Sequence, residues 1–167
     1  MVPLTTSRAE SLASVLRERS LRLSLAESCT GGMIGCIITS LPGSSEYFLG
    51  SAVTYSNESK QSILGVSSDT LAAHGAVSPE TAAEMAAGSL RAYGSDIAAS
   101  VTGIAGPGGA VEGKPVGTVW MAVTDGNRTV TYGNHFSGSR DEIRRKSADT
   151  LLAHIEGFLM EDHGQIR

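Results

Sequence analysis

Lys60 stands out because basic residues are scarce around it: it is the only Lys or Arg within residues 23–90. Tyr55 and Ser45 supply hydroxyl groups a short distance before it in the chain. A lysine whose pKa is lowered by burial can accept a proton from a serine, and a tyrosine can relay or donate one. These residue types therefore indicate proton transfer to and from a nucleophilic hydroxyl. The alternative is an exposed lysine on a short helix, paired with a neighbouring acidic residue.

A second polar segment, ESCTGG at 27–32, lies where a strand is expected to run into a helix. Polar residues at such a junction lie beyond the carboxyl end of the strand, where open α/β sheets bind ligands. The free N–H groups of the helix start favour an anion or a developing oxyanion. Ser28 is thus a second candidate for the chemistry, and the alternative is a helix cap with a tight turn. Cys29 is interpreted as a small packed residue.

Six glycines fall within residues 103–117, directly after Thr102. Such a loop lets backbone N–H groups approach a ligand closely, whereas an ordinary surface loop is the alternative. The stretch from Gly108 to Lys114 has most of the spacing of a phosphate-binding P-loop, but Pro115 replaces the required Ser or Thr. The sequence therefore predicts no ATP binding by that route. Separately, no cofactor is expected.

Two arginines four residues apart, Arg140 and Arg144, fall in the first turns of the last expected helix. Cations there oppose the helix macrodipole, unlike the neighbouring Asp141 and Glu142, which suit it. A bound phosphate would relieve that conflict, and salt bridges to the neighbouring acids are the alternative.

Helices and strands interleave along the chain, and an antiparallel pair comes late. Helices are expected near residues 5–20, 30–41, 57–64, 78–93 and 139–160, and strands near 21–27, 47–55, 96–103 and in a hairpin around 125–127. Apolar periodicity, a Ser-Pro start at residue 78 and breakers such as Pro42 and Gly94 place these bounds. Asn57 is the expected cap of the short helix. This order predicts an α/β fold, a three-layer α/β/α sandwich with a mixed β-sheet.

The composition is that of one soluble globular domain of 167 residues, spanning 1–167, with 41% hydrophobic and 18% charged residues. Twenty glycines, about 12% of the chain, exceed the usual ~7%. No run of ~18 apolar residues exists, so no membrane span is expected. The net charge of −4 argues against a broad nucleic-acid interface.

The cysteines and histidines indicate neither a disulfide nor a metal site. Cys29 and Cys36 lie seven residues apart in one expected helix, about 10 Å along it, which is too far for a disulfide. A reduced, cytoplasmic setting follows, and the first residues show no signal-peptide pattern. The four histidines form no ligand cluster, so no metal is expected; they are His74, His135, His154 and His163.

Six ordered motifs give the chain a specific resemblance. They are LAESCTGG at 25–32, VTYSNESK at 53–60, HGAVS at 74–78, TGIAGPGG at 102–109, KPVGTVW at 114–120 and FSGSRDEIRR at 136–145. Together they resemble the C-terminal domain of the competence-damage-inducible protein CinA over about residues 8–160. That family includes stand-alone nicotinamide-nucleotide amidases. One departure is the stretch 106–111, which lacks a glycine and a hydroxyl found in many members.

The resemblance implies hydrolysis of the carboxamide of nicotinamide mononucleotide to nicotinate mononucleotide and ammonia, in pyridine nucleotide recycling. It also implies a homodimer or higher homo-oligomer and no metal. The family places a serine, a lysine and a tyrosine at the active site. Here Ser45 is the expected nucleophile, with Lys60 and Tyr55 activating it, and Ser28 is the second choice.

The substrate would be a small-molecule nucleotide held by backbone and side chains of several motifs. The expected binding residues are Thr30, Gly31, Thr102, Gly103, Ala105, Gly106, and Arg140 or Arg144 for the ribose phosphate. The start of the 30–41 helix would supply the oxyanion donors. Two other functions fit the sequence: a non-catalytic nucleotide-binding or regulatory module, and an amidase with a different substrate.

Overall fold

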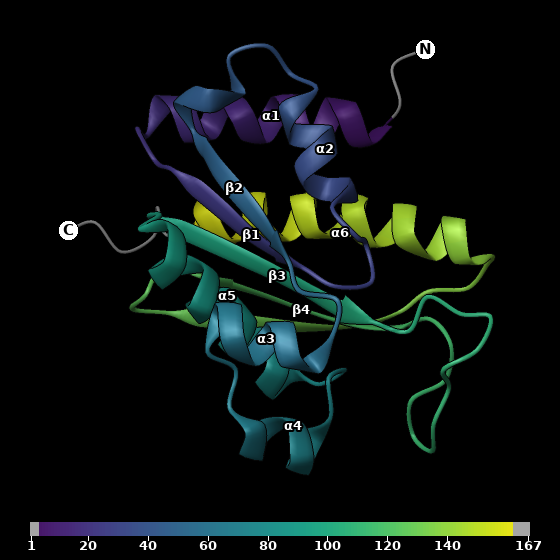
Figure 1. Ribbon diagram of the computed structural model, residues 1–167. Helices are drawn as coiled ribbons and strands as arrows, with labels where there is room; N and C mark the ends of the chain where they lie inside the picture. The colour runs from purple at the N-terminus through teal and green to yellow at the C-terminus, as the bar shows by residue number, and fades with distance from the viewer. Residues whose placement is uncertain (1–3, 162–167) are drawn as a thin grey trace.

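The computed structural model describes residues 4–161 (Figure 1). Its helices are α1 (Leu4–Glu18), α2 (Met33–Thr39), the 3-10 turn η1 (Ser44–Glu46), α3 (Asn57–Leu64), α4 (Ser68–His74), α5 (Pro79–Tyr93) and α6 (Arg140–Glu161). Its strands are β1 (Leu23–Glu27), β2 (Phe48–Val53), β3 (Ile97–Gly103), β4 (Thr118–Thr124) and β5 (Thr129–His135). None of the helices described is both long enough and apolar enough to span a lipid bilayer.

The five strands form one sheet in the order β2-β1-β3-β4-β5. The first three run parallel, and β4 and β5 are antiparallel to their neighbours. The central strands β1 and β3 are buried almost throughout, as parallel strands covered on both faces must be. The mixed sheet expected from the sequence is therefore confirmed.

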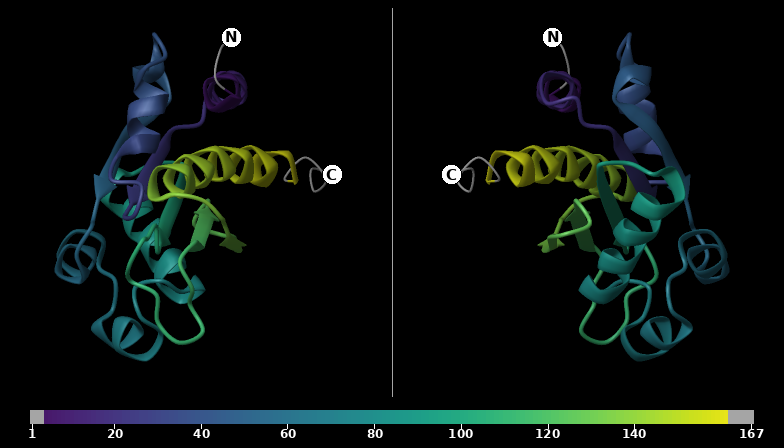
Figure 2. Two further views of the ribbon diagram at one scale, coloured as in Figure 1. Left: turned by 90° about the vertical axis from the view of Figure 1, so that its right-hand side faces the viewer. Right: turned by 90° about the vertical axis from the view of Figure 1, so that its left-hand side faces the viewer.

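Helices cover both faces of the sheet. One face carries α1, α2 and α6, and the other carries α3, α4 and α5, as the end-on views show most clearly (Figures 1 and 2). The main apolar core lies between the sheet and the first group, where α6 contributes Ile143, Leu151, Leu152 and Phe158. The three-layer α/β/α sandwich is thus confirmed.

The second helix starts later than the sequence predicted. Gly31 and Gly32 have φ angles of 59° and 97°, in the left-handed region that glycine adopts readily, so residues 28–32 form a turn instead of the first turn of a helix. Consequently Cys29 lies in this turn, whereas Cys36 lies in α2, and both thiols are free.

Other boundaries also differ from the expectations. The cap of α3 is Ser56, whose hydroxyl accepts from the Ser59 N–H, so the expected cap at Asn57 is wrong by one residue. The predicted strand over 47–55 is β2, which is shorter at both ends. Two short elements, η1 and α4, were not predicted, because each is too brief to show an apolar period.

The carboxyl ends of β1, β2 and β3 meet at one edge of the sheet. Glu27 at the end of β1 pairs with Val53 at the end of β2 on one side and with Val101 of β3 on the other. The three segments that follow these strands are therefore neighbours in space, although they are far apart in sequence. They are the residues following Glu27, those following Val53 and the glycine-rich loop from Gly103.

Two helical glycines offer a matched stability test. A Cβ at Gly88 in α5 would lie 2.1 Å from the carbonyl oxygen of Leu64, at the end of α3, whereas a Cβ at Gly157 in α6 would meet nothing within 4 Å. We expect Gly88→Ala to lower the free energy of unfolding by about 2–4 kcal/mol, since α3 and α5 must separate. Gly157→Ala should raise it by about 0.5–1 kcal/mol. Urea unfolding measures both, and a Gly88→Ala protein as stable as the parent would contradict the tight packing.

Candidate active site

Lys60 is buried, with 1% of its surface exposed. Its Nζ donates hydrogen bonds to Ser28 Oγ at 2.9 Å and to the carbonyl oxygen of Thr54 at 2.7 Å. Burial lowers the pKa of its ammonium group from 10.5 to about 8. The alternative of an exposed lysine paired with an acidic neighbour is therefore wrong, and a substantial fraction of the amine is neutral near pH 8.

Strand pairing brings Lys60 to Ser28. The Thr54 N–H donates to the Glu27 carbonyl at 2.9 Å, so the chain leaving β2 stays against the chain leaving β1 for one residue beyond the strands. The short helix α3 then turns back over this junction. Its fourth residue, Lys60, thereby points down onto Ser28, and the contact spans 32 residues of sequence.

A buried carboxylate holds the start of the segment that carries Ser28. Helix α2 has Gly32 at its N-cap, without a capping side chain. Glu27, fully buried at the end of β1, takes that role. Its carboxylate accepts from the N–H groups of Ile34 and Gly35 and from the hydroxyls of Thr30 and Ser51, at 2.7–3.1 Å.

The first N–H groups of α2 are therefore engaged and do not face a ligand, contrary to the expected oxyanion site at the helix start. In the preceding turn the Ser28 N–H donates to Val101, and the Gly31 N–H donates to the Ser28 carbonyl. The Cys29 N–H has no acceptor on another residue in the part of the chain that the structure describes. It is the amide next to Ser28 that no other described residue accepts from, and it lies against the thiol of its own residue.

Arg144 lies against this turn and not in the cavity. Its Nε donates to the Cys29 carbonyl at 3.1 Å and its Nη2 donates to the Thr30 carbonyl at 2.9 Å. Thr30 is fully buried against Glu27, and neither it nor Gly31 lines the cavity. These three predicted binding residues therefore build the turn, and the structure does not bring them to the pocket.

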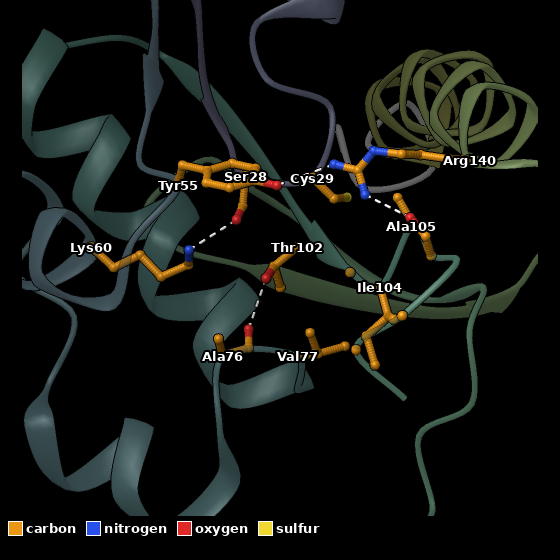
Figure 3. A pocket seen from close by; sticks show the side chains of 14 residues that line it. Ser28, Cys29, Tyr55, Lys60, Ala76, Val77, Thr102, Ile104, Ala105 and Arg140 are labelled. Atoms are coloured by element: carbon orange, nitrogen blue, oxygen red, sulfur yellow. Dashed lines mark hydrogen bonds between the residues drawn. The ribbon is translucent and has the colours of Figure 1, made fainter. Parts of the chain in front are cut away.

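A cavity of about 340 Å³ opens above Ser28 and Lys60, within the usual size range for a small-molecule site (Figure 3). Its lining includes the predicted Tyr55, Thr102, Gly103, Ala105, Gly106 and Arg140. Six further lining residues were not predicted as site residues: Cys29, Ala76, Val77, Ile104, Gly108 and Gly109. They lie inside the motifs that resemble the CinA family, but most have small or apolar side chains, so their residue types alone do not indicate a binding role.

Cys29 also lines the cavity, beside Ser28. It is buried, and burial raises the pKa of its thiol to about 11. A thiol with that pKa is almost entirely protonated at neutral pH, so it is a poor nucleophile. The interpretation of Cys29 as a packed small residue agrees with this environment.

Arg140 crosses the mouth of the cavity (Figure 3). One of its N–H groups donates to the Gly106 carbonyl at 2.7 Å and another donates to the Tyr55 hydroxyl at 3.1 Å. Tyr55 itself is 63% exposed. Of the two arginines predicted to bind phosphate, Arg140 therefore lines the pocket and Arg144 does not.

The glycine-rich loop forms the wall opposite α3. Gly106 has a φ of 79°, and a Cβ there would lie 2.5 Å from a methyl group of Val116, so only glycine fits. At the end of β3, Thr102 donates to the Ala76 carbonyl at 2.8 Å and ties the loop to the segment before α5. Among the residues described, the amide N–H groups of 105, 106, 108 and 109 have no acceptor.

Ser45 lies away from this site. It is exposed in η1, before β2 begins, whereas Lys60 follows the end of β2. The six residues of β2 separate the two ends by about 17–20 Å. The structure does not bring Ser45 to Lys60, because the strand between them is extended, and it brings Ser28 there instead.

No group of three or more His, Cys, Asp or Glu in residues 4–161 is arranged to hold a metal ion. His74 faces Glu80 on the surface, and His154 stacks on Tyr132 in the other half of the molecule. His163 lies outside the described residues.

Known proteins similar to this chain carry CinA or competence-damage-inducible names. The profile of the family described as CinA C-terminal domain matches residues 5–159. A CinA-like protein of Endomicrobium trichonymphae is 49% identical over 158 residues, which cover 92% of this chain and 37% of the relative. A putative competence-damage inducible protein of Moorella thermoacetica is 49% identical over 83% of this chain and 34% of the relative. The chain thus spans about a third of the length of these curated relatives.

Solved structures agree in fold over almost their whole length. The competence damage-inducible protein A (ComA) of Klebsiella pneumoniae superposes with a TM-score of 0.91 at 36% identity, covering 93% of this chain and 97% of that one. The competence/damage inducible protein CihA of Agrobacterium tumefaciens gives 0.90 at 36% identity, covering 94% and 96%. The chain therefore belongs to the CinA C-terminal domain family.

Proposed function

We propose that this protein is an amidohydrolase that converts nicotinamide mononucleotide to nicotinate mononucleotide and ammonia, with Ser28 as the nucleophile. The observation that carries the proposal is the buried Lys60 amine, 2.9 Å from Ser28 Oγ on the floor of the cavity. A neutral amine beside a serine hydroxyl is an arrangement suited to acyl transfer. The motif resemblance supports the choice of a nicotinamide nucleotide.

In the first half-reaction Ser28 Oγ attacks the carboxamide carbon. Its proton passes to the neutral Lys60 amine, and the Cys29 N–H stabilises the oxyanion that develops on the carbonyl oxygen. The Lys60 ammonium then returns a proton to the leaving nitrogen as the C–N bond breaks. Ammonia departs, and an ester of Ser28 remains.

In the second half-reaction a water molecule attacks the ester carbon and gives its proton to Lys60. The bond between Ser28 Oγ and the acyl carbon breaks, and Lys60 returns the proton to Ser28. Nicotinate mononucleotide is released, and the enzyme returns to its starting state. The exposed hydroxyl of Tyr55 at the mouth is suited to exchange protons between the pocket and solvent.

The charged half of the nucleotide would lie at the mouth of the cavity. Arg140 and the free amides of the glycine-rich loop are the groups there that can donate to a phosphate. Arg140 would exchange its present acceptors, Gly106 O and the Tyr55 hydroxyl, for phosphate oxygens. Arg140 is therefore the proposed phosphate-binding arginine, and Arg144, which does not line the cavity, has no contact with the phosphate in this proposal.

Release of ammonia from a panel of amides tests the proposal. Nicotinamide mononucleotide should be hydrolysed fastest, with NAD, nicotinamide riboside and simple amides slower. If another amide is hydrolysed faster, the proposed amidase mechanism is retained and the proposed substrate is replaced by that amide. Calorimetric binding of nucleotide without any ammonia would favour a regulatory module and contradict the amidase.

Arg140→Ala is expected to raise the KM for nicotinamide mononucleotide by about 10–100-fold, because a charged hydrogen bond to phosphate is lost. The value of kcat/KM for nicotinamide riboside, which has no phosphate, should change little. Arg145→Ala is the matched control, since Arg145 pairs with Asp141 on the surface. Equal losses on both substrates would contradict a phosphate contact.

The family resemblance also supports a homodimer or larger homo-oligomer in the cytoplasm. Light scattering on the purified chain measures the molecular mass and tests the assembly.

A further inference from the structure

Arg144 differs from the other arginines in residues 4–161, none of which donates to two backbone carbonyls. Both of its hydrogen bonds go to backbone carbonyls of the segment that follows Ser28, 114 and 115 residues away in sequence. The next residue, Arg145, forms an ordinary i,i+4 pair with Asp141 in solvent. Two adjacent arginines of α6 therefore have different partners: Arg144 contacts the backbone of another segment, and Arg145 contacts a side chain of its own helix.

The turn that Arg144 contacts comprises residues 28–31. On one side the chain closes it, through the Gly31 N–H that donates to the Ser28 carbonyl at 3.0 Å. On the other side the next two carbonyls, of Cys29 and Thr30, both accept from the guanidinium group. All three carbonyls of residues 28–30 are therefore fixed.

Because a peptide group is planar, fixing the carbonyls fixes the amides between them. Arg144 holds the Thr30–Gly31 peptide through its carbonyl, and the N–H of that peptide donates to the Ser28 carbonyl. The Ser28–Cys29 peptide, which carries the Cys29 N–H, is therefore held indirectly, and the backbone of the turn sets where the Ser28 side chain points. Gly31 permits the arrangement because its φ is 59°, in the left-handed region that glycine adopts readily.

An arginine suits this task better than a lysine. Its planar fork presents Nε–H and Nη2–H together, so one rigid group reaches two carbonyls. The opposite side of the turn is held by Glu27 through the Thr30 hydroxyl at 2.8 Å. The segment thus lies between a buried carboxylate and a guanidinium group.

We infer that Arg144 is a positioning residue: its guanidinium group holds the 28–31 turn so that the Ser28 hydroxyl meets Lys60 and the Cys29 N–H stays free for the oxyanion. The inference rests on the proposed role of Ser28 as nucleophile. Arg144 acts through the backbone of this turn and touches no substrate.

A small alkyl fluorophosphonate tests this role without assuming any natural substrate. Ser28 Oγ attacks phosphorus, the P–F bond breaks, fluoride leaves, and the serine proton goes to Lys60. The phosphoryl oxygen needs the same donor as the oxyanion. Mass spectrometry of the labelled peptide identifies the modified serine, and the second-order rate constant of labelling is the readout.

Wild-type protein should be labelled at Ser28, and Arg144→Met should be labelled about 100-fold more slowly. Arg144→Lys should fall between the two, and Arg145→Met should match wild type. In the amidase assay Arg144→Met should lower kcat and leave KM nearly unchanged. Guanidinium ion at millimolar concentration should partly restore labelling of Arg144→Ala, whereas potassium ion should not.

The possible failures are distinct. If wild-type protein is not labelled at Ser28, the proposed nucleophile is wrong and the inference falls with it. If wild type and Arg144→Met are labelled at the same rate, the proposed function stands and the inference is overturned. Should Arg144→Met fail to fold, Arg144→Lys and the guanidinium rescue of Arg144→Ala decide the question.

Discussion

Ser28→Ala is expected to reduce kcat for ammonia release by about 10⁴-fold or more, because within residues 4–161 no other hydroxyl is hydrogen-bonded to the Lys60 amine. The affinity for the product nucleotide, measured by calorimetry, should stay within a few-fold, since the remaining lining of the cavity is unchanged. Steady-state kinetics on nicotinamide mononucleotide measure the loss.

Ser45→Ala is the matched control. Ser45 is exposed in η1, at the far end of β2, so its loss should leave kcat within about 2-fold of wild type. An inactive Ser45→Ala enzyme together with a fully active Ser28→Ala enzyme would return the nucleophile to Ser45.

The second large effect concerns Lys60. Lys60→Met should lower kcat by about 10²–10⁴-fold, because the base that accepts the serine proton is removed. In the wild-type enzyme, kcat/KM should rise with pH through an apparent pKa of about 8, since only the neutral amine can act. The rising limb should be absent in Lys60→Met, and a pH profile is the measurement.

Lys146→Met is the control for charge, because Lys146 is exposed on α6 and donates to the Ser137 carbonyl. It should leave both kcat and the pH profile unchanged. A Lys60→Met enzyme that keeps the wild-type rate would exclude Lys60 as the base.

Stability gives a second readout for the same lysine. Its pKa is lowered in the folded protein, so the unfolded chain binds more protons between about pH 8 and 10.5. The buried charge therefore costs stability below pH 8, and this cost disappears as the pH rises through that window. Lys60→Met should consequently be at least as stable as wild type in urea at pH 7.

Sequence reasoning singled out Lys60 as the candidate base, but it ranked the serine that Lys60 contacts, Ser28, second to Ser45. Lys60 could be recognised because charge is scarce around it, and scarcity is visible in a single sequence. The partner depends on which strands pair. Ser45 is 15 residues from Lys60 and Ser28 is 32, but the parallel pairing of β1 with β2 reverses that order in space.

The arginines show a second limit. Spacing of four residues predicts that Arg140 and Arg144 lie on one side of the helix, and this suggested a shared ligand. The sequence contains no information on what each side chain meets across the interface with another element. Arg140 meets the pocket mouth, whereas Arg144 meets carbonyls of the turn before α2. The fold, by contrast, followed from local patterns of long elements, which a single sequence carries well.

The pairing of Glu27 with Val53 has a consequence for how the length of this chain can vary. Ser28 and Thr54 each follow that pair directly, and both accept from Lys60. One residue inserted within α3 before Lys60 would rotate Lys60 by about 100° about the helix axis and carry the amine away from the serine. An insertion in the turn around Pro42, at the opposite edge of the sheet, leaves this spacing intact. Natural and engineered length changes should therefore be tolerated at one edge of the sheet and excluded at the other.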